Sequence, residues 1–201
     1  MVLLAAPLSS LGLDFSKTEV ERLASGGTVR KPLPTSCKNG FYGGTGFTLV
    51  NAPIQIVWKF IQDWKLYEEA FPHIVESKEV YRNGEHSQIS MKLGYKILNL
   101  GYHLNVSKDW ENKTLSFTLA ENRPHDIQAT RGYWRLFPQP DGKTLVVYAV
   151  AAQVPQGISV FLGKTIEKDL ERSLIGLPKY LKRYLESPEG LAYQQLSAKH
   201  Q

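Results

Sequence analysis

Apolar residues recur every three or four positions along the C-terminal part of the chain. Within residues 159–186 they are Leu162, Ile166, Leu170, Leu174, Leu177, Leu181 and Tyr184. At 3.6 residues per turn these positions fall on one face, and lysines and arginines occupy the opposite face. The pattern predicts a long amphipathic helix over 159–186. Pro178 should kink this helix, because proline has no amide proton and its ring displaces the preceding turn.

Apolar and polar residues alternate upstream of this helix, which is typical of strands with one buried face. The apolar positions form four sets: Ile89, Met91 and Leu93; Leu98, Leu100, Tyr102, Leu104 and Val106; Leu115, Phe117 and Leu119; and Gly132, Trp134 and Leu136. Residues 144–154 are apolar on both faces, which indicates a central strand. Asn-Gly at 83–84 and Asp-Gly at 141–142 are strong hairpin turns. The sequence predicts about six antiparallel strands.

The first third of the chain is less regular. Residues 14–25 predict a short helix, since Ser16 and Glu19 have capping-box spacing. Residues 28–46 are rich in glycine, proline and lysine, and we expect an extended arm there. A strand over 46–51 should then lead into two short helices, the first beginning at Pro53. We therefore divide the chain into an N-terminal extension (1–43), a domain (44–186) and a mobile C-terminal tail (187–201).

Composition limits the classes of protein to consider. A chain of 201 residues suffices for one domain with a substantial core. The net charge of +5 is dispersed without a basic run, so we expect no nucleic-acid partner. Transient contact with a membrane surface is a minor expectation. Cys37 is the single cysteine, which excludes an intrachain disulfide. We expect a cytoplasmic protein, unless residues 1–12 are the remainder of a secretory signal, in which case it would be periplasmic or secreted.

The order of predicted elements, together with specific residues, resembles the START-like (SRPBCC) superfamily. The similarity extends over roughly residues 44–186 and is closest to the polyketide cyclase/dehydrase and coenzyme Q-binding branch. The residues that carry it are Val50-Asn51-Ala52-Pro53, Val57-Trp58, Asp63, Tyr67, Phe71-Pro72, Gly132-Tyr133-Trp134-Arg135-Leu136, Asp141-Gly142-Lys143-Thr144, Tyr148 and Pro155. The resemblance implies an α+β helix-grip fold, in which a curved antiparallel sheet of about six to seven strands wraps around a long C-terminal helix.

The resemblance also implies a hydrophobic cavity between that helix and the sheet. Members of the superfamily use it for lipids, sterols, quinones or polyketides; some cyclise a polyketide and others only bind and carry. We predict that the lining includes aromatic and apolar side chains of the strands, two residues at the cavity mouth and two of the helix. These ligand-binding candidates are Met91, Tyr102, Phe117, Trp134, Tyr148, Phe71, His73, Leu170 and Leu174.

The sequence contains no established catalytic motif and no histidine or carboxylate cluster at metal-ligand spacing. We therefore assign no catalytic residue, no metal and no cofactor. Glu68 and Glu69 are neighbouring carboxylates, but on a short exposed helix such a pair is usually solvated. The leading hypothesis is non-catalytic binding of a hydrophobic or amphipathic small molecule. The alternatives are an aromatase/cyclase-type enzyme and a protein-interaction module on a ribosome or respiratory complex. The oligomeric state stays open.

Overall fold

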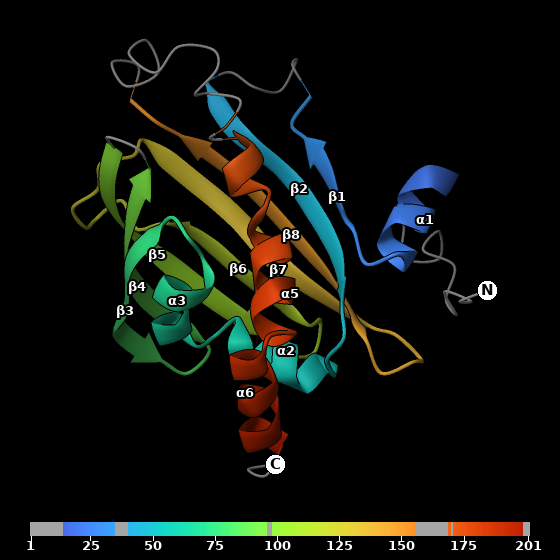
Figure 1. Ribbon diagram of the computed structural model, residues 1–201. Helices are drawn as coiled ribbons and strands as arrows, with labels where there is room; N and C mark the ends of the chain where they lie inside the picture. The colour runs from blue at the N-terminus through green and yellow to red at the C-terminus, as the bar shows by residue number, and fades with distance from the viewer. Residues whose placement is uncertain (1–13, 35–39, 96–97, 156–168, 170, 199–201) are drawn as a thin grey trace.

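A computed structural model describes residues 14–34, 40–95, 98–155, 169 and 171–198. One antiparallel sheet of eight strands forms the body of the protein, with the strand order β1-β2-β8-β7-β6-β5-β4-β3 (Figure 1). The strands are β1 (Thr28–Pro32), β2 (Phe41–Val50), β3 (Ile74–Asn83), β4 (His86–Tyr95), β5 (Leu98–Asp109), β6 (Thr114–Leu119), β7 (Ala129–Pro138) and β8 (Thr144–Gln153). The alternating segments of the sequence are therefore strands, as predicted.

Helices lie on both faces of this sheet. They are α1 (Lys17–Ala24), α2 (Ile54–Phe60), a 3-10 turn (Trp64–Leu66), α3 (Tyr67–Ala70), α5 (Leu177–Leu185) and α6 (Pro188–Ala198). We call the sheet face that α5 crosses the inner face and the opposite face the outer face (Figure 1). A C-terminal helix packed against an antiparallel sheet confirms the predicted α+β helix-grip architecture.

The inner and outer faces carry separate hydrophobic cores, which follow the period-two pattern of β8. Val146, Tyr148 and Val150 belong to the inner core, which α2, α3 and α5 cover. Leu145 and Val147 belong to the outer core instead, where α1 contributes Leu23, a fully buried residue. The continuous apolar run at 144–154 therefore reflects a central strand that is covered on both sides.

The N-terminal arm departs from the prediction. Residues 28–32 form the edge strand β1, and β2 begins at Phe41 instead of residue 46, so the sheet has eight strands instead of six to seven. β1 pairs with β2 from Thr28–Thr48 to Pro32–Gly44. Glycine and proline disfavour strands locally. β1 tolerates them because it is an edge strand and needs backbone hydrogen bonds to a neighbour on one side only.

The long C-terminal helix is interrupted. Residues 169 and 171–174 are helical, Ile175 and Gly176 form a turn, and α5 starts at Leu177. Pro178 thus lies in the first turn of α5, where its missing amide proton costs nothing, and does not kink a helix interior. The predicted stretch 159–168 and Leu170 lie outside the described residues.

The stretch after Ser187, expected to be a mobile tail, contains a helix, since residues 188–198 form α6. The ring of Tyr193 meets that of Phe60 in α2, with centroids 6.1 Å apart. The side-chain amide of Gln194 donates a hydrogen bond to the Leu185 carbonyl over 2.8 Å. α6 is therefore tied to both α2 and α5.

Gly46 determines how closely α5 approaches the sheet. A Cβ atom at this position would lie 2.3 Å from the Ile175 carbonyl oxygen and 3.2 Å from the Pro178 ring. The turn before α5 therefore sits directly on the β2 backbone, which only glycine allows. Lys182 adds a second link, donating a hydrogen bond over 2.8 Å to the carbonyl of Leu49 in β2.

Candidate functional site

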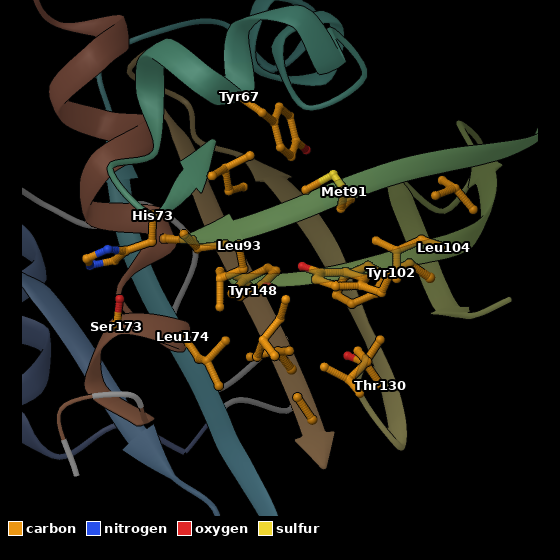
Figure 2. A pocket seen from close by; sticks show the side chains of 18 of the residues that line it. Tyr67, His73, Met91, Leu93, Tyr102, Leu104, Thr130, Tyr148, Ser173 and Leu174 are labelled. Carbon is orange, nitrogen blue, oxygen red and sulfur yellow. The ribbon is translucent and has the colours of Figure 1, made fainter. Parts of the chain in front are cut away.

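A cavity of about 100 Å³ lies between the inner face of the sheet and the helical residues before and at the start of α5 (Figure 2). The strands contribute Tyr42, Ile74, Met91, Leu93, Leu100, Tyr102, Leu104, Val106, Leu115, Phe117, Thr130, Trp134, Tyr148, Val150 and Ala152. Other segments contribute Trp64, Tyr67, His73, Ile127, Val154, Ser173, Leu174 and Leu177. The described lining is thus overwhelmingly apolar and aromatic.

The structure brings most of the predicted site residues together. The cavity lining includes Met91, Tyr102, Phe117, Trp134, Tyr148, His73 and Leu174. Phe71 is not in the lining; it is fully buried, and its ring centroid lies 6.3 Å from that of Trp134. Leu170 lies outside the described residues. That any of these side chains binds a ligand remains a prediction.

Sequence reasoning missed the contribution of the short helices. Trp64 and Tyr67 both line the cavity, with ring centroids 5.0 Å apart. Their spacing of three residues places them on the same helical face, which was the available signal. Ser173 and Thr130 were missed as well, and their hydroxyls are visible in Figure 2.

Aromatic rings from adjacent strands pack along the cavity wall. The Trp134 and Tyr148 centroids are 4.2 Å apart, and those of Phe117 and Tyr148 are 6.1 Å apart. Gly132 makes room for this arrangement, since a Cβ atom there would lie 2.5 Å from the Phe117 ring. This wall is therefore a continuous aromatic surface.

Tyr67 anchors one part of the lining through hydrogen bonds. Its hydroxyl donates to the Ile61 carbonyl over 2.8 Å and also interacts with the Trp134 side chain. Burial raises the pKa of Tyr67 far above its usual range. This hydroxyl holds α3 in place over β7.

Tyr102 and Tyr148 differ from Tyr67 in their partners. Neither hydroxyl makes a hydrogen bond to another described residue. Burial raises the pKa of Tyr102 to about 12 and that of Tyr148 well above 10.0. Both side chains therefore stay protonated at neutral pH and offer neutral O–H groups on an otherwise apolar wall.

Acid–base groups are sparse in the described lining. His73 is the one imidazole, and no carboxylate lies there. The Glu68 carboxylate accepts a hydrogen bond from the Ser77 amide over 2.9 Å, so it serves the α3–β3 junction. Over the described ranges, no group of three histidine, cysteine, aspartate or glutamate side chains could hold a metal ion. No described helix is long and apolar enough to span a bilayer.

The chain belongs to the family of polyketide cyclase / dehydrase and lipid transport proteins, whose model matches residues 50–175. This match confirms the START-like resemblance. The matched segment begins at the end of β2 and ends at the turn before α5, so it contains most of the cavity lining. No curated protein sequence matches the chain.

Solved structures share the fold at low identity. TTHA0849 from Thermus thermophilus is 18% identical with a TM-score of 0.62, over 74% of this chain and 96% of that one. The STAR-related lipid transfer protein from Xanthomonas axonopodis is 14% identical with a TM-score of 0.59, over 79% and 99%. The Zhui aromatase/cyclase from Streptomyces sp. R1128 is 12% identical with a TM-score of 0.55, over 80% and 95%. These similarities establish the architecture.

Proposed function

We propose that the protein binds a hydrophobic or amphipathic small molecule, without catalysis, in the cavity between the C-terminal helix and the inner face. The observation that carries this proposal is the composition of the wall. The described lining combines apolar side chains with a few neutral hydroxyls and contains no carboxylate. Such a surface favours an apolar ligand that has a small polar group.

The size of the cavity determines how a ligand would enter. The cavity volume of about 100 Å³ is small. Pockets for drug-sized ligands are typically about 300–1,000 Å³. A ligand must therefore displace side chains or the covering helix, and burial of its apolar surface supplies roughly 25 cal/mol per Å² toward that cost. A slender chain or a single ring needs the least displacement.

The tyrosine hydroxyls could determine how a bound ligand is oriented. Tyr102 and Tyr148 line the cavity, and no described residue accepts a hydrogen bond from either O–H group. A ligand carbonyl or hydroxyl oxygen would accept it. Lipid, quinone and polyketide-like molecules all carry such oxygens, and these are the ligand classes we propose.

A cyclase activity is less well supported by the same wall. Steering ring closure requires groups that give and take protons near neutral pH. The cavity tyrosines have raised pKa values, and they stay protonated in that range. The described lining contains one imidazole, that of His73, and no carboxylate. Binding needs none of these groups to ionise.

A pair of neighbouring alanines in β8 allows a matched test. Ala152 lines the cavity, whereas Ala151 is the adjacent residue and points to the other face of the sheet. We expect Ala152→Leu to weaken binding of a fluorescent fatty acid by about tenfold, because its added methyl groups take part of the small volume. Ala151→Leu adds the same atoms outside the cavity and should bind like the wild type.

Fluorescence titration of the three proteins measures this difference, with thermal unfolding as a check on folding. Equal affinity of all three would place the ligand outside the cavity. Native mass spectrometry of the purified protein addresses ligand identity, since a co-purifying lipophile adds its own mass. If no fatty acid or quinone probe shifts the mass or the fluorescence, the binding proposal is wrong.

A further inference from the structure

A second concave site lies at the β1 edge of the sheet, between α5 and the turn from α1 into β1. It encloses about 710 Å³, and its described lining contains six cationic side chains and one carboxylate. The cations are Arg22, Arg30, Arg172, Lys179, Lys182 and Arg183, and the carboxylate is Glu186. We call this site the basic groove. It borrows no lining residue from the cavity.

The fold itself directs these charges into one groove. In β1 the buried Val29 points to the outer core, so Thr28, Arg30 and Pro32 point to the side on which α5 lies. In α5 and its C-cap, the residues Lys179, Lys182, Arg183 and Glu186 follow the three- and four-residue spacing of one helical face. Two stretches about 150 positions apart in the sequence thus converge.

The two walls are held in register. Lys182 donates hydrogen bonds of 2.8 Å to the Leu49 carbonyl and to the Glu186 carboxylate. Its ammonium nitrogen lies 3.9 Å from the position a Cβ atom would take on Gly26, in the turn after α1. The Glu186 carboxylate also accepts a hydrogen bond from the Asn51 amide over 2.8 Å. Lys182 and Glu186 therefore form a structural pair, and the groove is preformed.

The remaining charges do not cancel. Glu186 is taken by Lys182, and the Arg172 guanidinium lies 3.8 Å from the Asp169 carboxylate. Arg22, Arg30, Lys179 and Arg183 have no carboxylate partner within the described part of the chain. Arg183 instead lies over the Tyr180 ring, 5.6 Å from its centroid. The four cations that line the basic groove repel each other, and a bound anion would reduce this repulsion.

We propose that the basic groove binds phosphate groups. Guanidinium groups match phosphate oxygens with paired hydrogen bonds, and an ammonium adds a mobile point charge, so three arginines and a lysine favour a multiply charged phosphate over a single carboxylate. The groove is concave and bounded on two sides, which suits a phosphate ester or diphosphate that enters between the walls. Its occupancy does not depend on the function of the cavity.

Charge reversal on the exposed face of α5 tests the proposal. In the Lys179→Glu/Arg183→Glu variant two groove cations become anions, whereas the structural Lys182 is kept. The matched control is Lys78→Glu/Lys92→Glu, which changes the net charge equally at two exposed positions on β3 and β4, near the opposite edge of the sheet. A third variant, Arg30→Gln, removes one charge from the β1 wall alone.

Isothermal titration of the full chain with inorganic pyrophosphate at low salt should give saturable binding. We expect the α5 variant to bind at least about tenfold more weakly, Arg30→Gln to bind more weakly as well, and the control to match the wild type. Circular dichroism melting shows whether each variant is folded. Equal weakening by the α5 variant and the control would mean that only net charge matters, and would overturn the proposal.

Sedimentation with phosphatidylcholine vesicles, with and without phosphatidylglycerol, separates the two sources of phosphate. Binding to phosphatidylglycerol vesicles that the α5 variant loses and the control keeps would support a lipid headgroup as the source. Pyrophosphate binding without vesicle binding would support a free phosphate compound. Binding to neither, or binding to a single-stranded RNA oligonucleotide alone, would overturn the proposal.

Discussion

Two tyrosines on the cavity wall differ in whether their hydroxyls have a partner, and this difference predicts opposite effects of the same substitution. Tyr67→Phe leaves the Ile61 carbonyl without its hydrogen bond, so we expect the free energy of unfolding to fall by about 1–2 kcal/mol. Tyr148→Phe removes a hydroxyl without a described partner, and should change it by less than about 0.5 kcal/mol. Urea denaturation measures both. Equal losses would show that the Tyr148 hydroxyl is bonded within the protein.

The buried tyrosines also predict how stability depends on alkaline pH. Tyr102 has a pKa of about 12 in the folded state, against 10.0 for an ordinary tyrosine. Between these values the unfolded chain loses a proton that the folded chain keeps, so folding stability falls as pH rises through this window. Below pH 10 the contribution is complete. We expect the urea midpoint to drop between pH 10 and 12, and the Tyr102→Phe variant to show a smaller drop.

At the residue scale, alternation in the sequence was enough to identify the inward side chains of the strands. Met91, Tyr102, Phe117 and Trp134 line the cavity because period two fixes the face once one residue is placed. Phe71 was misplaced, because it directly follows a four-residue helix, which is too short for periodicity to carry information. Whether a buried aromatic side chain touches empty space or another ring depends on packing between elements, which one sequence does not encode locally.

At the element scale, the approach of α5 to β2 depends on the absence of a side chain at Gly46. We expect Gly46→Ala to lower the free energy of unfolding by about 2 kcal/mol, because its Cβ would lie 2.3 Å from the Ile175 carbonyl and push the turn outward. Gly101→Ala is the control, since a Cβ in that strand has its nearest neighbour at 3.4 Å. Chemical denaturation of both proteins compares them. Equal stability would mean that α5 does not sit on β2.

The elements that sequence reasoning missed share a cause. β1 and the first half of β2 contain proline and glycines that disfavour strands, and they become strands because each pairs with a neighbour already in the sheet. α6 has no apolar stripe, and contacts such as that between Tyr193 and Phe60 hold it in place. Conversely, the apolar pattern of the predicted C-terminal helix continues through Gly176, although the chain turns there, next to β2. Tertiary contacts decide all three.

At the scale of the whole molecule, the helical segment that leads into α5 separates two sites that share no lining residue. Leu174 and Leu177 border the cavity, whereas the neighbouring Ile175 borders the basic groove. The turn at Ile175–Gly176 therefore forms part of the wall between them. The cavity depends on the segment that the family shares, from residue 50 to 175. The groove also needs α1 and β1, which precede that segment, so the N-terminal part adds a surface that the family match does not include.

We predict that the residues before 44 are part of the folded unit and not an appendage. Leu23 is fully buried in the outer core, so Leu23→Ala should lower the free energy of unfolding by about 2–5 kcal/mol in a single transition. Leu191→Ala deletes the same atoms from a half-exposed site on α6 and should cost less than about 1 kcal/mol. Urea denaturation followed by fluorescence and by circular dichroism measures both. Wild-type stability of Leu23→Ala would show that α1 does not contribute to the folded unit, whereas coincident, destabilised transitions would make it part of the domain.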